Sequence, residues 1–178
     1  MNAISARRQK GFSLMEVMVA LVVMIAGAVG VAQMVPYSLN LNTSNRSDST
    51  GLVIAQRELE QFLQQPLTST AYTDASANPC NPCNLGSNTN FNTFVGSPTM
   101  VLNNNRTLID FTQAKVANYN FTYVDAQDPT KTSYDVRWAV ATTGTAGNIM
   151  SRRIVIAVRK NGPGMYILPT TLDVTVSK

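Results

Sequence analysis

A long apolar run lies near the N-terminus of the chain. Residues 17–32 include no polar side chain, and within residues 12–35 the only charged residue is Glu16. As an α-helix with a rise of about 1.5 Å per residue, residues 12–35 would extend about 36 Å, whereas the hydrocarbon core of a bilayer is about 30 Å thick. The pattern therefore predicts a helix that is long enough to cross a membrane.

The next segment is polar at first and then amphipathic. Residues 40–50 are rich in Asn, Ser and Thr, and their propensities alone favour a loop. Beyond them, apolar residues recur at the spacings of three and four that are typical of one helix face: Leu52, Ile54, Ala55, Leu59, Phe62 and Leu63. The polar residues between them lie mostly off this stripe: Arg57, Glu58, Glu60 and Gln61. Pro66 ends the pattern, which predicts a helix that covers a hydrophobic core.

The C-terminal third of the chain has a period of two, which is typical of β-strands with one buried face. The alternation covers residues 119–124, 134–141, 153–159 and 172–177. Turn signals separate these runs at Asp128-Pro129, at residues 144–147 and at residues 162–164. We expect an antiparallel meander whose single apolar face lies under the amphipathic helix, with Tyr134 and Trp138 in the core.

The segment between the predicted helix and the predicted sheet has only weak periodicity. Residues 66–106 are dense in Asn, Thr, Ser and Pro. A loop of this length in a compact domain is usually functional or mobile. We expect a loop that either is functional or is only a solvated surface feature.

Composition limits the class of protein. The 178 residues, with a mass of 19.3 kDa, suit one domain with an added segment. Only 13% of the residues are charged, whereas about 25% is usual in soluble proteins, which agrees with a membrane segment. Histidine is absent, so the commonest general base, a Ser-His or Cys-His pair and the usual zinc sites are excluded. We expect no enzyme activity, no cofactor and no metal.

Positive charge is concentrated at the N-terminus. The net charge is +4, and Arg7, Arg8 and Lys10 supply three of the positive charges. The other basic residues are scattered along the sequence, so we do not expect nucleic acid to be the main partner. Basic residues before an apolar helix stay in the cytoplasm, which predicts a cytoplasmic N-terminus. A signal-like junction at Gly11 and Phe12 precedes the apolar run, whereas an ordinary secretory signal is cleaved after it.

The residues around this junction form the string Lys10-Gly11-Phe12-Ser13-Leu14-Met15-Glu16-Val17-Met18-Val19-Ala20-Leu21. The string resembles the type IV prepilin signal, also called the class III signal peptide. The resemblance implies that a membrane peptidase cleaves after Gly11 on the cytoplasmic side and methylates the amine of Phe12. It also implies that Glu16, the fifth residue of the mature chain, pairs with the terminal amine of a neighbouring subunit. Breaking such a buried pair typically costs about 3–5 kcal/mol.

The resemblance also implies an α+β fold of pilin type, in which a long N-terminal helix packs its second half on an antiparallel β-sheet. It favours helix through the polar residues 40–50, with a bend near Pro36 or the polar stretch. The expected organisation is a cleaved leader at residues 1–11, a membrane-spanning and filament-core helix at 12–36, an amphipathic helix at 37–65, a variable loop at 66–106 and the sheet of the head at 107–178.

Residues 22–30 resemble minor pilins of the PilV type, and Gln33 stands where major pilins commonly have proline. The resemblance implies a minor pilin of a type IV pilus, anchored in the bacterial inner membrane with a periplasmic head and then assembled into the filament or priming it. Its expected partners are other pilins and minor pilins, the prepilin peptidase, the inner membrane and the inner-membrane assembly platform. Two alternatives stay open: a pseudopilin of a type II secretion system, and a membrane-anchored periplasmic enzyme or sensor.

Cys80 and Cys83 form a single C-x-x-C motif. Zinc would need further ligands, and a thioredoxin-like redox site would need a helix N-terminus, which the neighbouring prolines disfavour. The predicted topology exports this segment to an oxidising compartment, which favours a disulfide over free thiols. We expect the disulfide to fix a surface turn.

Five acids of the predicted head are spread over loops and strands: Asp110, Asp125, Asp128, Asp135 and Asp173. A calcium site at Asp125 and Asp128 is an alternative, since some related pilins bind calcium, although the spacing is unlike that of an EF-hand. We expect all five acids to be solvated.

Overall fold

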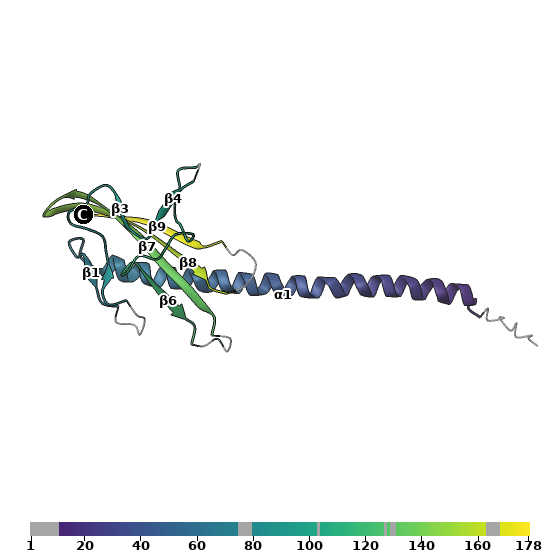
Figure 1. The fold of residues 1–178 in the computed structure, drawn as a ribbon. Helices are drawn as coiled ribbons and strands as arrows, with labels where there is room; N and C mark the ends of the chain where they lie inside the picture. Colours follow the sequence, from purple (N-terminus) through teal and green to yellow (C-terminus); the bar gives the residue numbers. More distant parts are fainter. Residues whose placement is uncertain (1–10, 75–79, 103, 127, 129–130, 163–167) are drawn as a thin grey trace, which may run out of the picture. The chain divides into compact units, whose positions relative to one another are not determined.

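A computed structural model describes residues 11–74, 80–102, 104–126, 128, 131–162 and 168–178 (Figure 1). The chain divides into two compact units, Met1–Thr43 and Ser44–Lys178. Helix α1, Leu14–Gln64, begins in the first unit and ends in the second, and all the strands belong to the second unit, which we call the head. One long N-terminal helix followed by antiparallel β-sheets is the predicted α+β layout, and this prediction is confirmed.

The N-terminus of α1 is capped by Ser13. The backbone N–H of Glu16 donates to the Ser13 hydroxyl at 3.2 Å, which satisfies one of the free donors of the first turn. The helix then continues without interruption through Pro36. In the first unit an 18-residue window reaches a mean hydropathy of 2.5 and none of it is buried. By length and composition, α1 can therefore cross a membrane.

The polar residues 40–50 are helical, as the family resemblance implied and against their own propensities. The hydroxyl of Thr43 donates to the carbonyl oxygen of Asn40, and that of Thr50 to the carbonyl oxygen of Arg46, both at 2.9 Å. These side chains therefore find partners inside the helix. Each such residue lowers the stability of the helix by only about 0.7 kcal/mol relative to Ala. The helical segments on either side of it outweigh this cost.

One face of the second half of α1 is buried in the head. Its residues are Ser47, Gly51, Ile54, Ala55, Glu58, Leu59 and Phe62. A Cβ atom added at Gly51 would lie 3.5 Å from the hydroxyl oxygen of Thr170 and 3.7 Å from the side chain of Val158, so the small residue allows close contact with the sheet. The predicted stripe is correct for four of its members and wrong for Leu52 and Leu63, which are 38% and 43% exposed.

The main sheet has five antiparallel strands. They are β3 (Phe94–Gly96), β6 (Asn120–Val124), β7 (Ser133–Thr145), β8 (Asn148–Lys160) and β9 (Thr170–Ser177). Strands β6 to β9 form the predicted meander, in which Trp138 of β7 lies opposite Ile156 of β8. Strand β8 pairs along one edge of β7, so β3 and β6 share its other edge end to end.

The turn predicted at residues 144–147 links β7 to β8. The register shifts between Thr143 and Gly144, which forms a bulge. Gly144 has a φ of 137°, and a Cβ atom there would collide with the carbonyl oxygen of Asn148, so this bulge requires glycine. Of the other two turn signals, Pro129 and residues 163–164 lie outside the described residues.

Short strands occupy the segment in which the sequence indicated none. Strand β1 (Ala71–Tyr72) pairs with β2 (Cys83–Asn84), and β4 (Thr99–Val101) pairs with β5 (Thr107–Ile109). Strand β3 also comes from this segment. A strand of two or three residues is too short to show a period of two, so the sequence pattern does not indicate these strands.

The core lies on both faces of the sheet, so the prediction of a single buried face is wrong. Trp138 is fully buried on the face toward α1, where its ring centroid is 5.3 Å from that of Phe62. On the opposite face a second cluster contains Ile109, Ala139, Val155 and Ala157, with Phe94 and Phe111 packed against it. Ile109 of β5 and Phe111, which follows β5, supply this cover.

Candidate functional site

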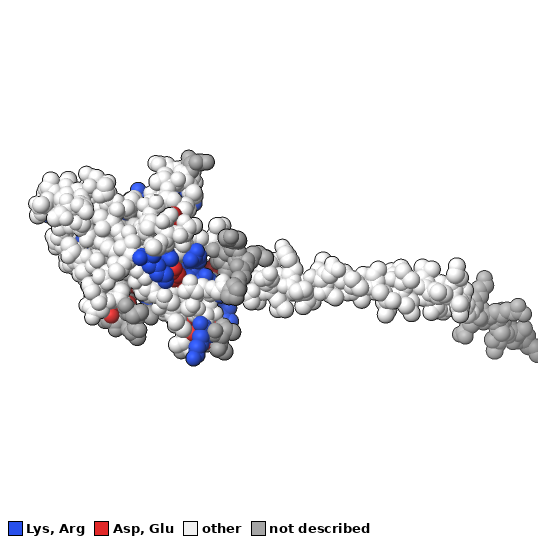
Figure 2. Space-filling view, viewed as in Figure 1, with Lys and Arg blue, Asp and Glu red and all other residues white. Residues whose placement is uncertain are grey.

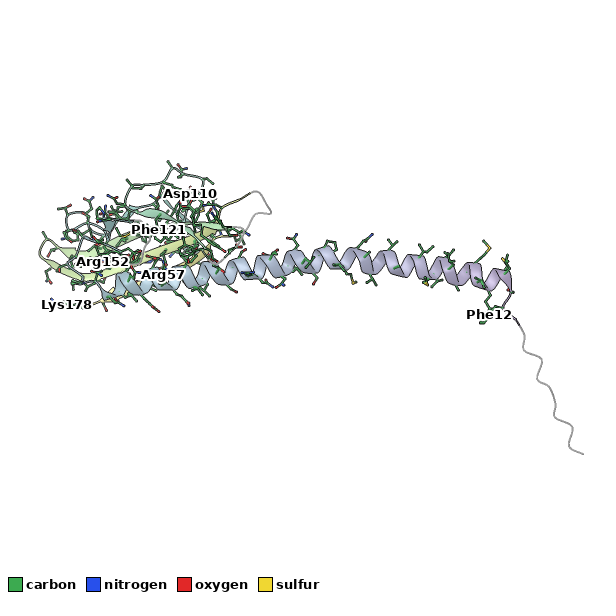
Figure 3. All side chains as sticks on the ribbon, turned by 90° about the horizontal axis from the view of Figure 1, so that it is seen from below. Phe12, Arg57, Asp110, Phe121, Arg152 and Lys178 are labelled. Atoms are coloured by element: carbon green, nitrogen blue, oxygen red, sulfur yellow. A yellow bond between two sulfur atoms is a disulfide. The ribbon has the colours of Figure 1, made fainter. Side chains whose placement is uncertain are left out.

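Gly11, Phe12 and Glu16 lie together at the start of α1. Gly11 and Phe12 precede the helix, and the Phe12 side chain is 82% exposed (Figure 3). Apart from its two chain neighbours, no heavy atom lies within 4 Å of a Cβ atom built on Gly11, so a side chain there would meet open space. Glu16 lies in the first turn and is exposed. The structure therefore presents the predicted cleavage junction openly and places the acid one turn into the helix.

Glu16 carries the only charge on the described part of the first unit. No ion pair formed by the described residues includes its carboxylate. The neighbouring helix surface is apolar; Leu14 and Met15, for example, are 81% and 72% exposed. Figure 2 agrees, since basic and acidic side chains are visible only over the head. A carboxylate in apolar surroundings is unfavourable unless it is paired, and such acids are usually functional.

The N-terminal residues match a known family model. Residues 6–32 match the model of the prokaryotic N-terminal methylation motif, which includes Gly11, Phe12 and Glu16. No curated protein and no solved structure matches the chain. The motif together with the α+β layout supports a type IV pilin-like or pseudopilin protein. Proteins of this type are structural, and the motif implies processing by prepilin peptidase and assembly with other pilins.

Cys80 and Cys83 form a disulfide in the structure. The two cysteines are 4% and 0% exposed and belong to the core, whereas Asn81 and Pro82 between them are exposed, so the disulfide closes a turn that reaches the surface. Next to them, the carbonyl oxygen of Asn84 accepts a hydrogen bond from the Trp138 indole at 2.8 Å. Residues 71–74 and 80–84, which we call the disulfide segment, are thereby attached to the centre of the sheet.

Asp135 lies in a buried ion cluster, and the expectation that it is solvated is wrong. Its residue surface is 1% exposed, and the guanidinium of Arg137 donates to its carboxylate twice, at 3.0 and 3.1 Å. Lys115 approaches the second carboxylate oxygen at 3.1 Å. The guanidinium of Arg137 also lies 4.8 Å from the ring centroid of Phe111. Charges buried in this way need partners, and here each has one.

The other four acids lie nearer the surface. Asp173 is exposed and pairs with Arg153 at 2.6 Å. Two hydrogen bonds from Thr112 hold the pKa of Asp110 below its usual value. Among the described residues, no group of three acids, cysteines or histidines is placed to hold a metal ion, and this includes Asp125 and Asp128.

Arg152 is a buried cation that the sequence analysis did not find. It is 2% exposed, and its guanidinium donates to the backbone carbonyl oxygens of Leu67 and Ser69, just beyond the end of α1. Burial lowers the pKa of this guanidinium. The last turn of α1 contains no basic residue, so Arg152 of β8 supplies the cation near the negative end of the helix dipole.

Glu58 was also missed. It has no exposed surface, although the sequence placed it off the apolar stripe. The guanidinium of Arg57 donates to its Oε1 at 2.8 Å. Burial is the main cause that raises the pKa of Glu58, and the nearby charge of Asp74 raises it further, whereas Arg57 and the Tyr72 hydroxyl lower it. The signal was present, because Glu58 lies four residues after Ile54 and four before Phe62, on the same helix face.

Proposed function

We propose that this chain is a minor pilin of a type IV pilus, of the PilV type. The observation that carries this proposal is the methylation motif at the start of an exposed apolar stretch of α1, residues 12–35, in which the single charged residue is Glu16. The chain is inserted in the inner membrane with the head in the periplasm. After processing it enters the filament, or primes its assembly on the inner-membrane platform.

The proposed organisation follows the expected ranges. Residues 1–11 form the leader, residues 12–36 the membrane and filament-core helix, residues 37–65 the amphipathic helix, residues 66–106 the variable segment and residues 107–178 the sheet of the head. The exposed apolar side chains of the first unit support the second assignment, because a surface of this kind needs lipid or neighbouring helices to cover it.

In this proposal Glu16 pairs with the methylated amine of Phe12 on a neighbouring subunit. The carboxylate is near the start of the helix and has no cationic partner among the described residues of its own chain. A cationic amine inside an apolar filament core needs an anion for the same reason. The two groups therefore satisfy each other only after assembly, which couples the pairing to the growth of the filament.

Leader removal gives a direct test of processing. We expect cleavage between Gly11 and Phe12, which removes eleven of the 178 residues and leaves 167. Intact-mass measurement of native protein should show this loss together with one methyl group. Replacement of Gly11 by a bulky residue should leave the precursor in the membrane. A mature N-terminus beyond residue 32 would instead indicate an ordinary secretory signal.

Stoichiometry separates the minor pilin from its alternatives. We expect quantitative mass spectrometry of sheared, purified pili to find this chain at a few copies beside an abundant major pilin. Its appearance as the dominant subunit would identify a major pilin. Absence from pili, together with loss of protein secretion when the gene is deleted, would favour the pseudopilin.

A further inference from the structure

The contact between α1 and the disulfide segment contains a carboxylate that is only half satisfied. Glu58 Oε1 accepts a hydrogen bond from Arg57, but Oε2 is buried and has no hydrogen-bond partner among the described residues. A buried acceptor without a partner has lost its hydration and has gained no hydrogen bond in return, which is unfavourable. The ionised form of Glu58 is therefore poorly accommodated at this position.

The groups that face Glu58 come from two elements. Arg57 is its neighbour on α1, and Tyr72 and Asp74 lie in and just beyond β1. The hydroxyl of Tyr72 is also buried without a hydrogen-bond partner among the described residues. Burial raises the pKa of Tyr72, so the phenol stays protonated. One cation therefore faces two carboxylates.

Arg57 has a second contact that does not need the carboxylate. Its guanidinium lies 5.4 Å from the ring centroid of Tyr123 on β6, and its side chain is 37% exposed. If Glu58 became neutral, Arg57 would keep this aromatic contact and its hydration. Loss of the charge on Glu58 therefore does not leave the Arg57 guanidinium buried without a favourable contact.

We propose that Glu58 is a proton-linked contact that makes the packing of the disulfide segment on α1 depend on pH. When the carboxylate takes up a proton from solvent, its repulsion with Asp74 disappears. The Tyr72 hydroxyl interacts with the carboxylate and favours its ionised form, but burial outweighs this contribution. Ionisation at higher pH restores the repulsion and loosens the contact.

The pairing of the strands carries the effect further into the head. Tyr72 pairs with Cys83 in the β1–β2 ladder, and the N–H of Asp74 donates to the carbonyl oxygen of Cys80 at 3.4 Å. Both contacts of Glu58 on this side are thus tied to the disulfide. The inference concerns the stability of the head and does not depend on the proposed function.

The sign of the pH dependence follows from linkage. The pKa of Glu58 is raised above its ordinary value of 4.5 in the folded protein. The folded state then binds the proton more tightly than the unfolded state does. This contribution to stability is fully present below pH 4.5 and is lost as the pH rises through the raised pKa.

Carboxyl NMR tests the proton directly in the full-length protein in detergent micelles. The chain has three glutamates, Glu16, Glu58 and Glu60, so selective ¹³C labelling gives three carboxyl signals, assigned with E16Q, E58Q and E60Q. We expect the signal of Glu58 to titrate at a higher pH than that of Glu60, which is exposed and only two residues away. A midpoint for Glu58 at or below that of Glu60 would overturn the proposal. The assignment stands on E16Q and E60Q alone if E58Q does not fold.

Denaturant unfolding tests the consequence for stability. Trp138 is the single tryptophan and lies in the core, so its fluorescence reports unfolding of the head. The unfolding midpoint of E58Q minus that of the wild type should increase from pH 4.5 to pH 7. The matched control E60Q should show a constant difference. A difference for E58Q that does not change with pH would mean that Glu58 is only a structural residue.

Discussion

Replacing Trp138 by Ala is expected to lower the free energy of unfolding of the head by about 3–5 kcal/mol. Trp138 is fully buried, and its ring lies within 6.2 Å, centroid to centroid, of three other aromatic rings, those of Phe62, Tyr119 and Phe121. The substitution empties this space and also leaves the carbonyl oxygen of Asn84 without its donor. Denaturant unfolding in detergent, followed by circular dichroism of the strands, measures the loss.

Two further variants separate packing from hydrogen bonding at this position. Trp138→Phe keeps one aromatic ring but removes the donor to Asn84 and part of the indole, so its cost should be smaller than that of Trp138→Ala, with about 1–3 kcal/mol of it from the unpaired carbonyl oxygen. Leu168→Ala is the surface control, because Leu168 is 85% exposed, and its effect should stay within about 0.5 kcal/mol. A cost for Trp138→Ala as small as that of the surface control would contradict the proposed core. The amount of protein in cells should fall in the same order as the stability.

The long elements of this fold are predictable because each repeats its signal many times. Strands β7 and β8 each have 13 residues, and alternation within them places Trp138 and Ile156 on the same buried face. The helix is predictable for the same reason over its apolar run. For residues 40–50 only the family resemblance predicted helix, because their own propensities favour a loop. The helical segments on either side of them keep these residues helical.

The second buried face was not predictable from the alternation. Ala139, Val155 and Ala157 are small or branched apolar residues at positions that a one-sided sheet would expose, and the sequence analysis gave them no partner. Their cover comes from Ile109 and Phe111, which are distant in the sequence and lie in or beside a strand of three residues. The burial of Asp135 and Arg137 follows from the same cover.

The functional residues also differ in whether a local pattern predicts them. Gly11, Phe12 and Glu16 are predicted from a local motif, because their order along the chain carries the information. Glu58 and Arg152 were not, because what defines them is contact with Tyr72 and Asp74 in one case and with backbone carbonyl groups in the other. Helix spacing alone places Glu58 on the buried face, and only its residue type argued against that position.

Replacing Glu16 by Val is expected to leave membrane insertion intact while nearly abolishing entry into the filament. An acid is costly in an apolar helix and valine is favourable there, so the variant should reach the membrane at least as well as the wild type. In the filament, the same change leaves the cationic amine of a neighbouring subunit without its anion. Loss of one partner of a buried pair costs about 3–5 kcal/mol, which corresponds to roughly a hundredfold or greater loss of incorporation.

The matched control is Gln33→Val, which also replaces a polar residue of the exposed apolar helix by Val but removes no charge. Quantitative mass spectrometry of membranes and of sheared filaments, with each variant expressed beside a tagged wild-type copy, gives the ratio of incorporation to insertion. This ratio should fall for Glu16→Val and stay near one for Gln33→Val. A ratio near one for both variants would show that Glu16 has no part in subunit pairing. An equal fall in both would indicate that any change in this helix disturbs its packing.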